Sequence, residues 1–242
     1  PNLFIEPFSG SGVATLTAIA ENYAARAVMV ELDPDIASVW KTVLNKTQAA
    51  WLAKRILEFE FTRENVREVL VIKPSSKRRR ALRTIIWNRA TRGGIMAHGS
   101  GFVKNGENGK GISSRWYPKT LEKRIEDIVS LRNRIEFVES DAFRVIEKHL
   151  DDYTAALFLD PPYTVTGRRL YRFNEIDHDQ LFYFAAMHKG PVLLTYDDAL
   201  EIRNLAERHN FAYKRIVMQN THLQKKYELL ISRDFEWLKE NE

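Results

Sequence analysis

The tetrapeptide Asp160-Pro161-Pro162-Tyr163 brings together a carboxylate, two prolines and an aromatic ring. It directly follows the apolar run 155–159, which predicts a short buried strand. Proline has no N–H group for the ladder of a sheet, so this strand is expected to end at Asp160. Open α/β sheets bind their ligands at the carboxyl ends of their strands. Asp160 and Tyr163 are therefore candidates for a ligand-binding or catalytic site at that edge of the sheet.

A second candidate segment is the glycine-rich turn Glu6-Pro7-Phe8-Ser9-Gly10-Ser11-Gly12. It lies between an apolar stretch at 3–5, read as a strand, and residues 13–23, whose apolar spacing predicts a helix. A strand, a glycine turn and a helix present backbone N–H groups and a helix amino end to a ligand. The dinucleotide fingerprint requires glycine or alanine where Thr15 stands. Without its context, a tight turn explains the two glycines equally well.

The context is a second apolar strand at 27–30 that ends at Glu31. An acidic residue about 20 positions after the glycines can accept hydrogen bonds from the hydroxyl groups of a ribose. Asp33, just before Pro34, is expected to cap a helix that runs to about residue 44. The first forty residues therefore predict a βαβ unit that binds an adenosine-like ligand.

Positive charge is concentrated between Lys41 and Lys119, which hold 18 Lys and Arg against 5 Asp and Glu. The whole chain has a net charge of only +5, so the rest of it is acidic. Helices are expected at 51–61 and 62–72, and a helical stretch to residue 89 begins with Lys77-Arg78-Arg79-Arg80. A glycine-rich loop then runs from 93 to 111. A solvated helical face is one explanation of such a charge run. The combination of charge and loop favours contact with a nucleic acid.

Alternation of strands and helices resumes after residue 120, with a strand at 135–138 that leads to Asp141. Further strands are expected at 192–195, 213–218 and 227–231. If the first strand and the Asp160 strand are neighbours where the strand order reverses, their ends flank one crevice. The expected fold is therefore α/β, with a doubly wound Rossmann-like sheet. The expected domains are a catalytic domain at 1–40 and 121–242 and a mainly helical, basic insert at 41–120.

Several functional classes are excluded by composition. The chain has 242 residues and no cysteine, which removes disulfides, thiolate metal sites and cysteine nucleophiles. It has no apolar run of eighteen residues and no signal peptide, so no membrane span is expected and a cytoplasmic location is the default. The spacing of His, Asp and Glu suggests no metal site.

The two motifs, placed in order on either side of a basic insert, resemble the S-adenosylmethionine-dependent N6-adenine DNA methyltransferases of the Dam type. The resemblance covers nearly the whole chain, in the order cofactor motif, target-recognition insert and catalytic motif. It implies S-adenosylmethionine as cofactor, double-stranded DNA as substrate, extrusion of the target base and direct methyl transfer. A cognate restriction endonuclease is a candidate partner, and among oligomeric states we favour a monomer. The family has a segment before the first strand that contacts the cofactor, and we expect residues upstream of Pro1.

The resemblance also assigns roles to residues. The Asp160 side chain and the Pro161 carbonyl would accept hydrogen bonds from the adenine amine, Pro162 would stiffen the loop and Tyr163 would stack on the extruded base. The residues expected to bind the cofactor are Glu6, Pro7, Phe8, Gly10, Gly12, Glu31, Asp141 and Ala142. Glu31 would hold the ribose, and Asp141 with the Ala142 backbone would read the adenine ring, although Asp141 could instead cap a helix. The residues expected to contact DNA are Lys77, Arg78, Arg79, Arg80, Arg168 and Arg169.

Three alternatives stay open. The same amine chemistry would serve an RNA adenine methyltransferase or an N4-cytosine methyltransferase. A catalytically silent nucleic-acid-binding homologue would keep the basic insert without the reaction. An oxidoreductase is the least favoured, because Thr15 breaks the dinucleotide fingerprint and Asp160-Pro161-Pro162-Tyr163 would go unexplained.

Overall fold

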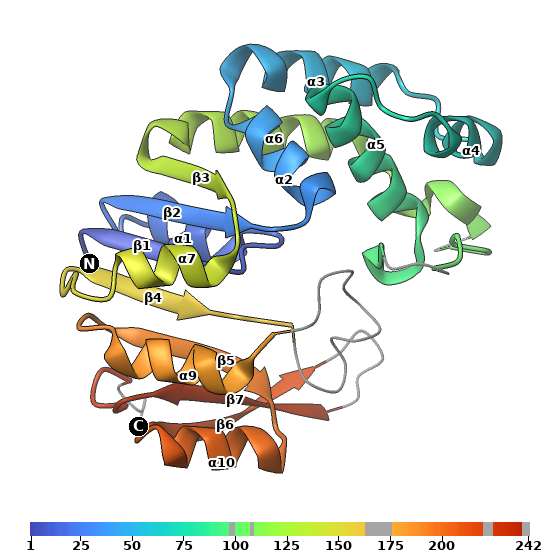
Figure 1. The fold of residues 1–242 in the computed structure, drawn as a ribbon. Coiled ribbons are helices and arrows are strands. Elements are labelled where there is room, and N and C mark those ends of the chain that lie inside the picture. The colour runs from blue at the N-terminus through green and yellow to red at the C-terminus, as the bar shows by residue number, and fades with distance from the viewer. Residues whose placement is uncertain (97–99, 107–108, 163–175, 220–224, 239–242) are drawn as a thin grey trace. The chain divides into compact units, whose positions relative to one another are not determined.

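The computed structural model describes residues 1–96, 100–106, 109–162, 176–219 and 225–238 (Figure 1). Three residues of the predicted site, Tyr163, Arg168 and Arg169, lie outside this part. The chain divides into two compact units. The sheet unit comprises Pro1–Val30, Ser140–Arg168 and Asn174–Glu242, and the helical unit comprises Glu31–Glu139 with Arg169–Phe173.

Seven strands of the described residues form one sheet in the order β3-β2-β1-β4-β5-β7-β6. Parallel pairs join β1 to β2, β1 to β4 and β4 to β5, whereas β7 is antiparallel to both β5 and β6. The strands are β1 (Leu3–Glu6), β2 (Arg26–Glu31), β3 (Ile135–Glu139), β4 (Ala155–Leu159), β5 (Val192–Asp197), β6 (Ala212–Gln219) and β7 (Lys225–Ser232).

The strand order reverses between β1 and β4, which are neighbours with Ile5 opposite Leu157. Chain order runs from β1 to β2 on one side of this point and from β4 to β5 on the other. Right-handed connections therefore place α1 (Val13–Ala20) and α9 (His178–Met187) on opposite faces of the sheet. The predicted α/β class, the doubly wound order and the pairing of the first strand with the Asp160 strand are confirmed.

Burial explains why the central strands are almost continuously apolar, since parallel strands are covered on both faces. Ile5, Leu159 and Leu194 have no exposed surface. On one face of the sheet, α7 (Ala142–Lys148) packs beside α9, where the rings of Phe143 and Phe184 lie 5.9 Å apart between centroids. The last helix of this unit, α10 (Leu200–Arg208), contacts α9 and β6.

The helical unit contains the predicted basic insert, 41–120. Its α-helices are α2 (Pro34–Val43), α3 (Lys46–Glu58), α4 (Arg63–Val71), α5 (Lys77–Ala90) and α6 (Pro118–Leu131). Its short 3-10 helices are η1 (Arg92–Gly94), η3 (Gly111–Arg115) and η4 (Arg132–Arg134). The mainly helical character predicted for 41–120 is confirmed in the described part of that segment.

The expected bounds of two helices in this unit were wrong. The helix expected at 51–61 begins at Lys46, because the Asn45 side chain accepts a hydrogen bond from the Gln48 N–H at 3.1 Å and caps it there. The helix expected at 62–72 begins at Arg63, and Thr62 is its N-cap rather than its first residue. The side chains of the N-cap residues, and not the spacing of the apolar residues, determine where both helices begin.

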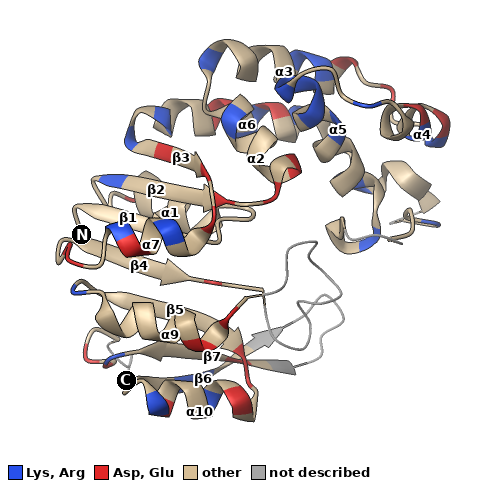
Figure 2. Cartoon of the chain, viewed as in Figure 1, with Lys and Arg blue, Asp and Glu red and all other residues tan. Residues whose placement is uncertain are grey.

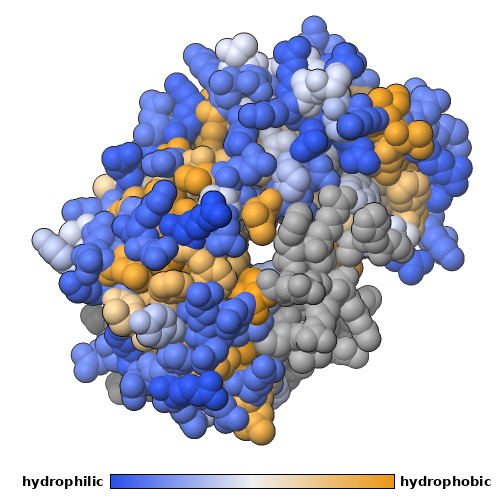
Figure 3. All heavy atoms as spheres, in the orientation of Figure 1, coloured by the Kyte–Doolittle hydropathy of each residue, from blue (hydrophilic) through white to orange (hydrophobic). Residues whose placement is uncertain are grey.

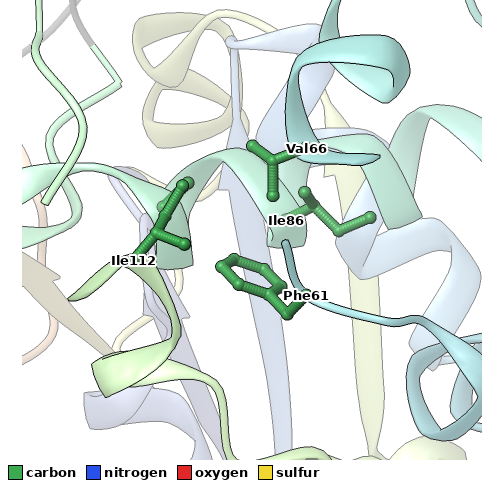
Figure 4. Packing of buried hydrophobic residues seen from close by; sticks show 5 residues of the cluster. Phe61, Val66, Ile86 and Ile112 are labelled. Atoms are coloured by element: carbon green, nitrogen blue, oxygen red, sulfur yellow. The ribbon is translucent and has the colours of Figure 1, made fainter. Parts of the chain in front are cut away.

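One hydrophobic cluster of the helical unit lies between α4, α5 and η3 and is shown in Figure 4. Its buried residues are Phe61, Val66, Ile86, Ala90 and Ile112. The ring of Trp116 stacks on Phe61 with centroids 4.4 Å apart, and Phe59 meets Trp116 edge-on at 5.8 Å. Aromatic pairs of this kind add to the stability gained by burial. The basic segment thus has a hydrophobic core of its own.

Candidate functional site

Asp160 directly follows β4, and its carboxylate is exposed at the carboxyl end of that strand. The preceding Leu159 is fully buried and pairs with Leu194 on β5. One position further along, the Thr195 hydroxyl donates a hydrogen bond to Asp160 Oδ1 at 2.8 Å. Pro161 is buried and Pro162 is half-buried, so the two residues directly after Asp160 are packed against the protein. Sequence reasoning missed Thr195.

Hydrogen bonds from Ser9 hold the glycine-rich turn in place. Its hydroxyl bonds the carbonyl of Glu6 at 2.9 Å and that of Val30 at 2.8 Å, and its N–H donates to the Val30 carbonyl at 3.0 Å. Gly10 and Gly12 have φ angles of 45° and 65°, which other residues rarely adopt. A Cβ on Gly10 would meet no atom within 4 Å, so the space above this residue is open. The turn is therefore rigid on its buried side and accessible at Gly10.

Glu6 lies beneath this turn and is only 4% exposed. Its Oε2 accepts a hydrogen bond from the Thr15 N–H at 3.0 Å, in the first turn of α1. The N-cap of α1 is Gly12, which has no side chain to fill this role. Glu6 thus joins the end of β1 to the start of α1. Burial raises the pKa of Glu6 to about 7; the hydrogen bond from the Thr15 N–H opposes this shift, and the negative charge of Asp160 adds to it.

The predicted adenine-reading residue Asp141 is the N-cap of α7, where its Oδ1 accepts a hydrogen bond from the Phe143 N–H at 2.9 Å. Its neighbour Ala142 is buried. The helix-capping role that the sequence left open for Asp141 is therefore present. Phe8, in the glycine turn, is half-buried, and Pro7 is buried.

The end of β2 is organised by a chain of carboxylates in the helical unit. Glu31 Oε1 accepts a hydrogen bond from the Asp33 N–H at 2.9 Å. Asp33 Oδ1 in turn accepts one from the Asp35 N–H at 2.8 Å and caps α2, as predicted. Since each carboxylate accepts the N–H two residues further on, the Glu31 side chain is held in a defined position at the end of its strand.

The four basic residues Lys77, Arg78, Arg79 and Arg80 form the first turn of α5, behind the N-cap Ser76. Positive charge at this end opposes the helix dipole, so helix stability does not explain it. The Arg78 guanidinium lies 4.6 Å from the ring centroid of Trp51, and Arg80 Nε lies 3.8 Å from Asp35 Oδ1. Lys77 and Arg79 are exposed and form no ion pair within the described residues. Figure 2 shows further Lys and Arg along α3, α5 and α6.

A second basic group lies at the other end of α5. Arg115 Nη1 donates to the carbonyls of Asn88 and Thr91, at 2.9 and 2.6 Å. Burial lowers the pKa of the half-buried Arg89, and the positive charges of Arg115 and Arg124 lower it further. Neither Arg89 nor Arg124 has an acidic partner in the part of the chain that is described. The cluster therefore keeps uncompensated positive charge, and no sequence signal had singled it out.

The surface over α3 and α6 is mostly hydrophilic (Figure 3). No helix of the described ranges is long and apolar enough to cross a membrane. Within the same ranges, no group of three or more His, Asp or Glu could hold a metal ion.

Comparisons with known proteins place the chain in a family. The chain is similar to a conserved hypothetical protein from Streptococcus pyogenes, with 13% identity and a TM-score of 0.41 over 96% of this chain and 86% of that one. It is similar to the rRNA methyltransferase aviRa from Streptomyces viridochromogenes, with 11% identity and a TM-score of 0.41 over 96% and 77% of the two chains. No curated protein matches it. The model of the D12 class N6 adenine-specific DNA methyltransferases matches residues 1–221, which include both motifs and the basic segment. The chain belongs to the D12 class N6 adenine-specific DNA methyltransferase family.

Proposed function

We propose that the protein methylates the N6 amine of adenine in double-stranded DNA with S-adenosylmethionine, and that Asp160 carries the reaction. The observation behind this assignment is the exposed Asp160 carboxylate at the carboxyl end of β4, next to the strand that leads into the glycine turn. This is the switch point of a doubly wound sheet, where such sheets bind ligands. The chain also belongs to a family of adenine-specific DNA methyltransferases, which agrees with this reaction.

The residue types suit the reaction. The exocyclic amine of adenine is a poor nucleophile, because its lone pair is delocalised into the ring. In the proposal, the Asp160 carboxylate and the Pro161 carbonyl accept hydrogen bonds from its two protons and localise the lone pair as attack proceeds. Such contacts strengthen in the transition state and therefore accelerate the reaction. Pro162 stiffens the loop, and Tyr163 stacks on the base after its extrusion from the duplex.

The turn between β1 and α1 fits a cofactor with a carboxylate and a nucleoside. S-adenosylmethionine, when bound, supplies an electrophilic methyl group. The first amides of α1 have no side-chain cap other than Glu6 at Thr15, so the Val13 and Ala14 N–H groups are suited to a ligand carboxylate. The open space at Gly10 allows a ligand to approach the backbone.

The remaining residues assigned to the cofactor differ in how deeply they are buried. Glu31 is assigned to the ribose hydroxyls, and Asp141 with the Ala142 backbone to the adenine ring. Phe8, half-buried, and Gly12 are assigned to the wall of the site. Glu6 and Pro7 are buried, which favours a role in holding the turn rather than direct contact with the cofactor.

The basic segment at 41–120 is proposed to bind the DNA and to recognise the target sequence, with 1–40 and 121–242 as the catalytic domain. Support comes from Lys77 and Arg79, which carry charge that the described protein does not neutralise, and from Arg89 at the other end of α5. Arg168 and Arg169 are assigned to the backbone near the extruded base. Action as a monomer, a cognate restriction endonuclease as partner and a cytoplasmic location complete the proposal.

The test is methyl transfer from labelled S-adenosylmethionine to duplex DNA and, in parallel, to structured RNA, followed by separation of the nucleosides. Label in N6-methyl-2′-deoxyadenosine from DNA is expected. Label in N4-methylcytosine, or in RNA with none in DNA, would replace the proposal by the corresponding alternative. Binding of DNA by the full-length protein with no label anywhere would identify a catalytically silent homologue.

A further inference from the structure

The contact between Thr195 and Asp160 joins the carboxyl ends of two neighbouring parallel strands. Leu159 of β4 pairs with Leu194 of β5, so Asp160 and Thr195 are the next residues on each strand. The Thr195 hydroxyl is a donor at 2.8 Å from Asp160 Oδ1. A hydrogen bond to an ionised carboxylate is stronger than one between neutral groups. The side chain of Asp160 is thus held by a residue 35 positions away in the sequence.

Thr195 is itself fixed from several sides. Its backbone lies opposite Leu230 in the antiparallel pairing of β5 with β7. The next residue, Tyr196, is fully buried, and its hydroxyl lies 2.8 Å from His178 Nδ1 on α9. Threonine is branched at Cβ, which restricts rotation about χ1. The hydroxyl is therefore a rigid donor anchored in the sheet rather than a mobile surface group.

We propose that Thr195 is a positioning residue for methyl transfer, which holds the Asp160 carboxylate in the orientation that accepts the target amine. The inference rests on the proposed role of Asp160. Pro161 and Pro162 restrict the backbone after the carboxylate, but they do not fix the rotation of the Asp160 side chain. Thr195 supplies that restraint. Its hydroxyl touches neither the base nor the methyl group in this assignment, so it acts through Asp160.

Loss of the hydroxyl is expected to slow the chemical step and to leave binding intact. A misplacement of about 1 Å at a reacting group can cost about 100-fold in rate. We therefore expect Thr195→Val, which keeps the branched shape, to lower kcat by about 10- to 100-fold. Thr195→Ser restores a hydroxyl and is expected to recover most of this loss. The KM for DNA and the dissociation constant of S-adenosylmethionine are expected to stay within about threefold of the wild type, since both ligands keep their contacts.

The structure offers a matched control at the other end of β4, the strand that Asp160 directly follows. Thr154 Oγ1 donates to Asp152 Oδ1 at 2.7 Å in the turn before β4, so Thr154→Val removes the same kind of hydrogen bond away from the site. The experiment measures kcat and KM on duplex DNA, cofactor binding by calorimetry and melting temperature for the full-length wild type, Thr195→Val, Thr195→Ser and Thr154→Val.

The positioning role predicts a low kcat for Thr195→Val, a kcat close to wild type for Thr195→Ser and an unchanged kcat for Thr154→Val. Cofactor binding should be equal in all of them. This set of results would support the role. Thr195→Val with wild-type kcat would overturn it, as would Thr195→Ser that is as slow as Thr195→Val. If Thr195→Val weakens cofactor binding in proportion to its rate, the role is binding and not positioning. A wild type that transfers no methyl group would instead refute the proposed function itself. Thr195→Ser also covers the case in which the valine variant fails to fold.

Discussion

Glu6 and Asp160 lie at the ends of adjacent parallel strands, and the negative charge of Asp160 adds to burial in raising the pKa of Glu6 to about 7. The two carboxyl groups have opposite surroundings. Glu6 is buried and receives the Thr15 N–H, whereas Asp160 is exposed and receives the Thr195 hydroxyl. A pair of acidic groups with different environments can take different roles. Glu6 supports the glycine turn, and Asp160 lies exposed directly after β4.

The raised pKa of Glu6 makes stability depend on pH. Folding favours the protonated form, so stability is lost as pH rises from about 4.5 through about 7, where the folded protein must give up this proton. Glu6→Gln cannot titrate. We expect its free energy of unfolding, relative to the wild type, to rise by about 1–3 kcal/mol between about pH 5 and pH 8. Urea unfolding at several pH values measures this difference, and parallel curves for the two proteins would contradict it.

Lys77 and Arg79 are expected to contact DNA phosphates. Each such contact contributes about 0.9 to the slope of log affinity against log salt concentration. Lys77→Ala with Arg79→Ala is therefore expected to flatten this slope by about one to two and to weaken binding to all sequences alike. Lys54→Ala with Arg55→Ala is the matched control, because both of these residues pair with Glu58 on α3. An equal loss in both double variants would indicate a general effect of net charge and no specific contact.

We expect Arg89 to contribute to DNA binding and not to stability. Its removal relieves repulsion from Arg115 and Arg124, so Arg89→Gln should unfold at the same or a higher temperature than the wild type. Its affinity for DNA should fall at low salt, since uncompensated charge attracts the phosphate backbone. Thermal melting and DNA titration on the same preparation measure both quantities. Lower stability with unchanged affinity would show that Arg89 serves the fold and not the DNA.

The hydrophobic cluster between α4, α5 and η3 should depend on Phe61, which stacks on Trp116 at 4.4 Å. Phe61→Ala is expected to cost about 3–5 kcal/mol, because it removes a buried ring and leaves a cavity. Val71→Ala, on α4 and 86% exposed, should change stability by less than about 0.5 kcal/mol. Hydrogen exchange of the α4 and α5 amides reports on this unit. Equal protection of these amides in both variants would contradict the assignment of this core.

Local patterns in the sequence were enough to predict most elements of the sheet unit. Apolar runs identified β1, β4 and β5, and the prolines after Asp160 marked the end of β4. The side-by-side arrangement of β1 and β4 followed from the rule for ligand sites in open sheets. The family resemblance, based on the two motifs and their order, agrees with the family that residues 1–221 match.

What could not be predicted depends on contacts between distant residues. A threonine at the end of a strand gives no sign of bonding a carboxylate on the next strand, so Thr195 was missed. The burial of Glu6 could not be read from its residue type either, and its role at the cofactor stays a prediction. Arg89 and Arg115 are separated by 26 positions, and only folding brings their charges close enough to interact.

A single-turnover assay with labelled S-adenosylmethionine and duplex DNA can ask whether the Asp160 carboxylate carries methyl transfer to adenine. The full-length wild type and Asp160→Asn would be compared at equal occupancy of both ligands, with nucleosides separated after the reaction. We expect N6-methyl-2′-deoxyadenosine from the wild type and a rate at least about 100-fold lower from Asp160→Asn, because the amide cannot supply the charge that stabilises the transition state. Wild-type rates in Asp160→Asn, or label in a cytosine, would contradict this role.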